Sequence, residues 1–134
     1  MRRSSGRCKV AFVGAGYMSR EHIRAFQDVP GVEITGIHSR TPSRAEVLAK
    51  EFHLPSVCGS IAELFEKSAA DLVVVSVPEL SVNEVCRACF EYPWTALIEK
   101  PAGYNVADAE AIESVARQRF AVLRDRALGR IQDV

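Results

Sequence analysis

The sequence predicts an α/β domain in which helices cover both faces of a doubly wound parallel sheet, giving three layers, α/β/α. Short apolar runs of strand length alternate with amphipathic stretches of helix length along most of the 134 residues. One run, Leu72–Val77, is rich in valine, which is typical of a strand covered on both faces. Strands that alternate with helices in this way are expected to be parallel and joined by right-handed crossovers.

The first βαβ unit is the clearest part of the pattern. Cys8–Val13 is predicted as a strand, and a helix is expected from about Tyr17 to Asp28. Pro30 and Gly31 then end this helix, because neither residue continues it well. A second strand is expected at Val32–His38.

The second helix is predicted to begin at Thr41 and Pro42. Threonine is a good N-cap, and proline is favoured at the first helical position because its missing N–H costs nothing there. The helix is expected to run to about Phe52, before Pro55. A short third strand is expected at Ser56–Cys58.

Two capping boxes mark the next helix starts. Ser60–Glu63 and Ser81–Glu84 both have serine followed three residues later by glutamate. The first opens a helix before the Leu72–Val77 strand, and the second opens a helix over Val82–Glu91. The fifth strand is expected at Trp94–Ile98.

The last helix is expected to begin after Asn105, which is a suitable N-cap. The apolar residues that follow have close to helical spacing, at Val106, Ala109, Ile112 and Val115. A sixth strand is expected at Phe120–Leu123.

Composition excludes several classes of partner. The 17 basic residues balance the 17 acidic ones, so no overall positive field favours nucleic acid or an anionic membrane. No apolar run approaches the roughly 20 residues of a membrane span, and no signal peptide is recognisable. We therefore expect a cytoplasmic protein that binds neither membranes nor nucleic acid.

The four cysteines are expected to be reduced and buried. Cys86 and Cys89 form a CxxC, but it lies within an expected helix, whereas a redox pair requires a helix N-terminus to stabilise the thiolate. A structural zinc site would require a second ligand pair, and the histidines are scattered along the chain.

A glycine-rich turn joins the first strand to the first helix. Gly14 and Gly16 match the first two positions of the dinucleotide fingerprint GxGxxG, and Ser19 occupies the third, where a small residue suffices. The context of strand, turn and helix predicts a Rossmann fold that binds the pyrophosphate of NAD(P) at the helix N-terminus. The alternative is a tight turn in an α/β domain that binds no nucleotide. The predicted cofactor contacts are Gly14, Ala15, Gly16, Tyr17 and Met18.

The end of the second strand favours NADP(H) over NAD(H). NAD-specific folds usually have a carboxylate there to bind the ribose hydroxyls. This sequence has Ser39, Arg40 and Thr41 instead, with Arg44 one turn later. Hydroxyl and guanidinium groups would bind a 2′-phosphate that a carboxylate would repel. The alternative is that both arginines are simply solvated at a helix start.

Two further segments follow the fourth and fifth strands. Ligands of open α/β sheets bind at the carboxyl ends of the strands. Ser76, Val77 and Pro78 end the fourth strand, and Glu99, Lys100 and Pro101 follow the fifth. We expect all six residues to contact the cofactor.

These motifs together resemble the Gfo/Idh/MocA family of oxidoreductases, the glucose–fructose oxidoreductase and inositol dehydrogenase type. The resemblance covers about Lys9 to Arg117, and its most specific marker is the Glu-Lys-Pro at residues 99–101; Arg44-Ala45 and Asp71 also fit. It implies an enzyme that transfers hydride to or from a sugar, polyol or related hydroxy or keto compound. It further implies that Lys100 lies near the nicotinamide and acts catalytically, and that the bond between Lys100 and Pro101 is cis.

The resemblance also implies a division of the chain. Residues 1–7 are expected to be a flexible tail, residues 8–118 the NAD(P)-binding domain, and residues 119–134 the sixth strand and the start of a segment leading to a substrate domain. Without that second domain the chain is expected to be inactive or weakly active, and it could associate with itself. Where the family commonly has histidine after the fourth strand, this sequence has Val82, with Asn83 beside it.

Two other functions fit the same residues. The chain could be a nucleotide-sensing or regulatory domain without chemistry of its own. It could also be a structural α/β module whose glycines only make turns.

Overall fold

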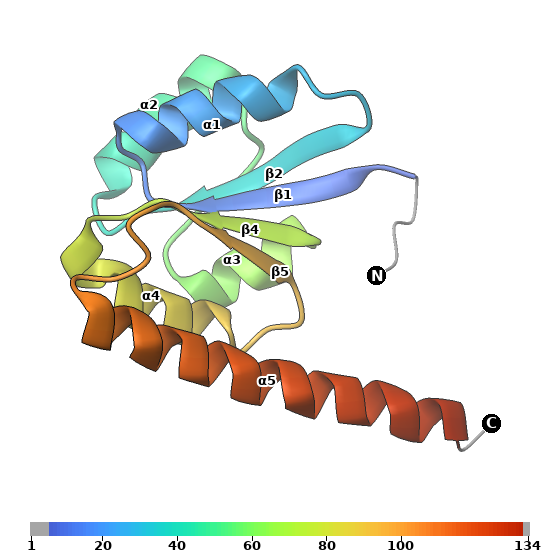
Figure 1. Ribbon diagram of the computed structural model, residues 1–134. Helices are drawn as coiled ribbons and strands as arrows, with labels where there is room; N and C mark the ends of the chain where they lie inside the picture. Colours follow the sequence, from blue (N-terminus) through green and yellow to red (C-terminus); the bar gives the residue numbers. More distant parts are fainter. Residues whose placement is uncertain (1–5, 133–134) are drawn as a thin grey trace.

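The computed structural model confirms the predicted fold class. It describes residues 6–132, with side chains through residue 121. Five parallel strands form one sheet in the order β3-β2-β1-β4-β5, and helices lie on both of its faces (Figure 1). The order reverses direction between β1 and β4, which is the position where doubly wound folds bind their ligands. Most of the predicted tail at residues 1–7 lies outside the described residues.

The elements agree with the predicted ones to within a few residues, except near the C-terminus. The strands are β1 Cys8–Val13, β2 Val32–His38, β3 Val57–Cys58, β4 Leu72–Val75 and β5 Thr95–Ile98. The helices are α1 Tyr17–Gln27, α2 Pro42–Phe52, α3 Ile61–Ser68, α4 Val82–Cys89 and α5 Val106–Gln132, with a 3-10 turn, η1, at Glu79–Ser81. Differences of this size are usual where helices and strands end.

The sheet separates two hydrophobic cores. Successive residues of β1 point to opposite faces. Val10 and Phe12 pack with residues of α1 and α2, whereas Ala11 and Val13 pack with residues of α3, α4 and α5. Both cores have fully buried members, so the strands are covered on both sides, as the valine-rich β4 predicted. The cores hold the carboxyl ends of β1 and β4 in fixed positions at one edge of the sheet.

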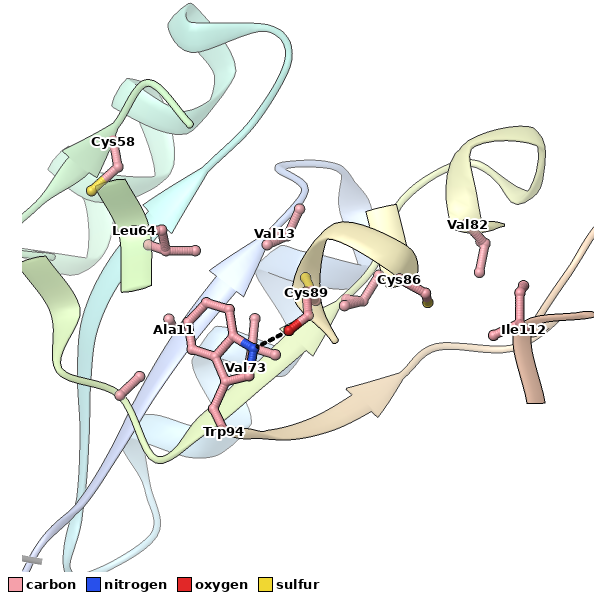
Figure 2. Close-up of a cluster of buried hydrophobic side chains, with 12 residues drawn as sticks. Ala11, Val13, Cys58, Leu64, Val73, Val82, Cys86, Cys89, Trp94 and Ile112 are labelled. Carbon is pink, nitrogen blue, oxygen red and sulfur yellow. Dashed lines mark hydrogen bonds between the residues drawn. The ribbon is translucent and has the colours of Figure 1, made fainter. Parts of the chain in front are cut away.

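Trp94 closes the core on the α4 side. Its indole Nε1 donates a hydrogen bond of 2.7 Å to the carbonyl of Cys89 (Figure 2). The ring also packs edge-on against Phe65 and Tyr92. The buried indole N–H is therefore satisfied. This contact ties the end of α4 to the beginning of β5, the strand that leads to the Glu-Lys-Pro segment.

The four cysteines are free; Cys58, Cys86 and Cys89 are buried as predicted, whereas Cys8 is only half-buried. We predict that the three buried thiols resist thiol reagents. Burial raises the pKa of Cys86 to about 11 and that of Cys89 to about 12, and it also raises the pKa of Cys58. At pH 8 a thiol with a pKa of 11 is only about 0.1% thiolate, the reactive form. The half-buried Cys8 should react with an aromatic disulfide in the native protein, and all four should react after denaturation. Rapid labelling of Cys86 in the native protein would contradict this assignment.

The sixth strand predicted at Phe120–Leu123 is wrong. These residues lie inside α5, a 27-residue helix (Figure 1). The segment that follows Arg117 is rich in alanine, leucine and arginine, which are strong helix formers. A short apolar run within such a segment can lie in a helix as readily as in a strand. Despite its length, α5 is not apolar enough to cross a membrane, and neither is any other helix within residues 6–132.

The first of the two predicted capping boxes forms in part, with its returning bond one residue before the N-cap, and the second does not form. Ser60 Oγ accepts a hydrogen bond from the Glu63 N–H, and the Glu63 carboxylate accepts one from the N–H of Gly59. Ser81, in contrast, ends the 3-10 turn η1 and makes no side-chain cap. Its hydroxyl accepts a hydrogen bond from Arg40 instead. Because Arg40, at the end of β2, lies close to Ser81, the serine hydroxyl bonds to Arg40 instead of capping α4.

Candidate functional site

A cleft of about 420 Å³ lies at the carboxyl ends of the strands, next to the point between β1 and β4 where the strand order reverses. Its size is within the range of small-molecule and cofactor sites. The residues that line it follow β1, β2, β4 and β5 or lie on the helices beside them. They are Val13, Gly14, Ala15, Gly16, Tyr17, Met18, His38, Ser39, Arg40, Thr41, Arg44, Ile61, Ser76, Val77, Pro78, Val85, Glu99 and Lys100.

Gly14 is required by the packing of the protein itself. Its φ is +110°, which side chains rarely adopt, and a Cβ at this position would lie 1.9 Å from the carbonyl oxygen of Ser76. The Gly14 N–H donates a 2.8 Å hydrogen bond to the carbonyl of His38. Gly14 therefore brings the ends of β1, β2 and β4 together beneath the cleft.

Gly16 has a different role, because no described neighbour requires it to be glycine. Its backbone is extended, with φ −92° and ψ −166°, and a Cβ built there would meet nothing within 4 Å. It is the N-cap of α1 and is exposed in the cleft. The free N–H groups of the first helical turn therefore face a space that remains open to an anion. Ser19, in the third fingerprint position, is fully buried as the motif's packing role requires.

The end of β2 carries a positive charge beside the cleft. Arg40 and Arg44 are both exposed, and neither forms a salt bridge with another described residue. Arg40 Nη2 donates a 2.7 Å hydrogen bond to Ser81 Oγ, so the guanidinium is held by a neutral partner that leaves its charge uncompensated. Ser39 Oγ accepts from the Thr41 N–H at 3.1 Å, which keeps this hydroxyl at the start of α2.

The Glu-Lys-Pro segment closes the other end of the cleft. The Glu99 N–H continues the sheet by donating to the carbonyl of Val75 at 2.8 Å. Lys100 is exposed and lines the cleft, and the peptide bond between Lys100 and Pro101 is cis, as the resemblance implied. Pro101 itself does not line the cleft, so the structure brings together every predicted site residue except this proline.

A comparison with protein-family models identifies the family. Residues 8–124 match the model of GFO_IDH_MocA, described as an oxidoreductase family with an NAD-binding Rossmann fold. The chain belongs to the Gfo/Idh/MocA oxidoreductase family. Within this family the matched region is the nicotinamide dinucleotide-binding domain, which agrees with the glycine-rich turn and the cleft above it.

Individual Gfo/Idh/MocA-type proteins support this assignment. The dTDP-3,4-didehydro-2,6-dideoxy-alpha-D-glucose 3-reductase of Saccharopolyspora spinosa is 29% identical over 114 residues, which are 85% of this chain and 34% of that protein. KijD10, a 3-ketoreductase from Actinomadura kijaniata solved with NADP and TDP-benzene, is 28% identical with a TM-score of 0.73, over 84% of this chain and 35% of that one. An Agrobacterium radiobacter oxidoreductase solved with NAD+, L-tartaric acid and magnesium shares the fold, with a TM-score of 0.77 and 24% identity over 84% of this chain and 33% of that one.

The chain spans about a third of the length of the curated Gfo/Idh/MocA-type proteins that it matches. The covered shares are 35%, 30% and 33% for three of them. Solved neighbours hold either NAD+ or NADP, so they do not distinguish between the two cofactors.

The position at which the Gfo/Idh/MocA family commonly has histidine does not face the cleft in this chain. Val82 is 2% exposed and belongs to the core on the α4 side. The neighbouring Asn83 donates to Asp108 Oδ1 at 2.7 Å and accepts from Arg87 Nε at 2.6 Å. Hydrogen bonds from the Tyr104 N–H and from Asn83 lower the pKa of Asp108. These contacts join α4 to the start of α5.

The sequence analysis missed His22, which contacts Glu99 of the Glu-Lys-Pro segment. His22 Nε2 and a Glu99 carboxylate oxygen form a hydrogen bond that joins α1 to the end of β5. Helical spacing could have indicated it, since His22 lies four residues after Met18, which lines the cleft. The linear sequence separates His22 and Glu99 by 77 positions, so only the topology brings them together.

Proposed function

We propose that this cleft binds NADP(H) in preference to NAD(H) for an oxidoreductase acting on a sugar, a polyol or a related hydroxy or keto compound. The observation that carries the proposal is the pair of features at one sheet edge. An open helix N-terminus at Gly16 adjoins two arginines without an acidic partner among the described residues. The first suits a pyrophosphate and the second a 2′-phosphate.

The lining residues divide the cleft into three parts. The turn from Gly14 to Met18 would hold the pyrophosphate through backbone N–H groups. The segment from Ser39 to Arg44 would hold the 2′-phosphate and ribose. The segment Ser76–Pro78, together with Glu99 and Lys100, would border the nicotinamide, which accepts or supplies the hydride when it is bound.

The proposed substrate class rests on what similar proteins act on. The Saccharopolyspora relative reduces a sugar nucleotide and KijD10 is a 3-ketoreductase, according to their names. In this chain Lys100 is the cleft residue suited to orient a hydroxyl or carbonyl, or to hold or transfer its proton, because its amine is a flexible cation at the proposed nicotinamide end. A cytoplasmic location and self-association stay predictions of the sequence.

Arg40→Ala should weaken NADPH binding roughly tenfold, because a charge-assisted hydrogen bond to phosphate contributes about 1.5–3 kcal/mol, part of which Arg44 can replace. NADH binding should change less than twofold. Titrations followed by calorimetry or by nicotinamide fluorescence measure both affinities. Arg24→Ala is the matched control, because Arg24 is exposed on α1 and does not line the cleft. Equal losses for both cofactors would contradict the NADP preference, and failure of the unmodified chain to bind either at millimolar concentration would contradict the whole proposal.

A further inference from the structure

Glu99 makes hydrogen bonds through both oxygens of its carboxylate. Oε2 is bonded to His22 Nε2 on α1, and Oε1 accepts the N–H of Lys100 at 3.0 Å. The side chains of His22 and Glu99 are 28% and 20% exposed, so water competes only partly with the bond between them. The carboxylate thereby connects the helix that begins at the pyrophosphate turn with the turn that carries Lys100.

The two bonds keep Glu99 ionised. The hydrogen bond from His22, followed by the one from the Lys100 N–H, lowers the pKa of Glu99. A protonated carboxyl would accept these bonds less well, so the ionised form and the bridging geometry support each other.

The same arrangement leaves the amine of Lys100 unpaired with Glu99. Although the two residues are adjacent, no ion pair within 4.0 Å joins Lys100 Nζ to a carboxylate among the residues with described side chains. Lys100 instead lines the cleft beside Glu99. If the bond to His22 were lost, the Glu99 carboxylate would be able to rotate. It would then be free to pair with the amine of Lys100, the nearest cation along the chain.

We propose that His22 is a positioning residue that holds Glu99, so that the turn after β5 presents the Lys100 amine at the nicotinamide end of the cleft. This inference rests on the proposed function and concerns only one end of the bound dinucleotide. His22 itself does not line the cleft, so its effect passes through Glu99. The pyrophosphate turn and the arginines near β2 should be unaffected by its loss.

The test compares two ligands that differ only at the nicotinamide end. NADPH carries the nicotinamide, and 2′-phospho-ADP-ribose lacks it. His22→Ala should weaken NADPH binding roughly tenfold and change 2′-phospho-ADP-ribose binding less than twofold. His22→Gln should restore NADPH binding to within about threefold, because the glutamine amide can donate from a position close to that of Nε2. The control is His53→Asn, at the exposed left-handed residue that ends α2.

A double-mutant cycle separates positioning from independent contacts. Glu99→Ala removes the same bond from its other side and serves as the test if His22→Ala does not fold. The variant that carries both substitutions should bind NADPH no more weakly than whichever single variant has the lower NADPH affinity. Additive losses, equal losses for both ligands, or no loss in His22→Ala would each overturn the positioning role. If the unmodified chain binds neither ligand, the proposed function itself is overturned, and this inference with it.

Discussion

Gly14→Ala is expected to destabilise the domain by roughly 3 kcal/mol or more. The new Cβ would lie 1.9 Å from the carbonyl oxygen of Ser76 and 2.8 Å from its carbonyl carbon, and both atoms belong to the backbone. To relieve these clashes, β1 and β4 would have to separate at their carboxyl ends, which both cores hold in place. The positive φ of +110° adds a conformational cost that an alanine cannot avoid. Chemical denaturation followed by circular dichroism would measure the loss.

The matched control for this prediction is Gly59→Ala. Gly59 has no positive φ, and a Cβ there would meet nothing within 4 Å, so the free energy of unfolding should change by less than about 0.5 kcal/mol. A stability of Gly14→Ala close to that of the unmodified chain would mean that β1 and β4 do not approach each other as described. The packing role assigned to Gly14 would then be wrong.

The sequence predicted the sheet and most of the cleft because the relevant signals are local. The valine-rich run at β4 is buried on both faces, and the order of strands and helices along the chain leaves few topologies open. Parallel strands bring their carboxyl ends to one edge, so the segments after β1, β2, β4 and β5 meet without further information. Most of the cleft residues could thus be predicted from the ends of the strands, whereas Ile61 and Val85, on α3 and α4, could not.

The errors and omissions arise where distant residues decide the outcome. Ser81 has the local signal of an N-cap, but its hydroxyl bonds to Arg40, which lies 41 positions away. The contact between His22 on α1 and Glu99, which follows β5, likewise joins residues 77 positions apart. At Phe120–Leu123 the pattern itself is ambiguous, because four apolar residues fit a strand and a helix equally well.

Gly16→Val is expected to weaken dinucleotide binding at least 100-fold while costing only about 1 kcal/mol of stability. The extended backbone at φ −92° and ψ −166° suits a β-branched residue, and the new side chain would meet no described atom within 4 Å of its Cβ. The modest stability cost arises because valine is a poorer N-cap than glycine. The binding loss arises because the side chain would occupy the space into which the first N–H groups of α1 point.

Gly14 and Gly16 therefore separate two explanations of one motif. If the glycines only make turns, Gly16→Val should bind NADPH as the unmodified chain does, since a Cβ at Gly16 would meet nothing within 4 Å. If Gly16 admits a pyrophosphate, binding should fail while the melting temperature stays within a few degrees of the original. Gly59→Val adds the same side chain at another open glycine that does not line the cleft, so it should leave NADPH affinity unchanged. Calorimetric titration of Gly16→Val and Gly59→Val beside the unmodified chain decides between the explanations. Only the ligand-contact explanation predicts that Gly16→Val loses NADPH binding while keeping its stability.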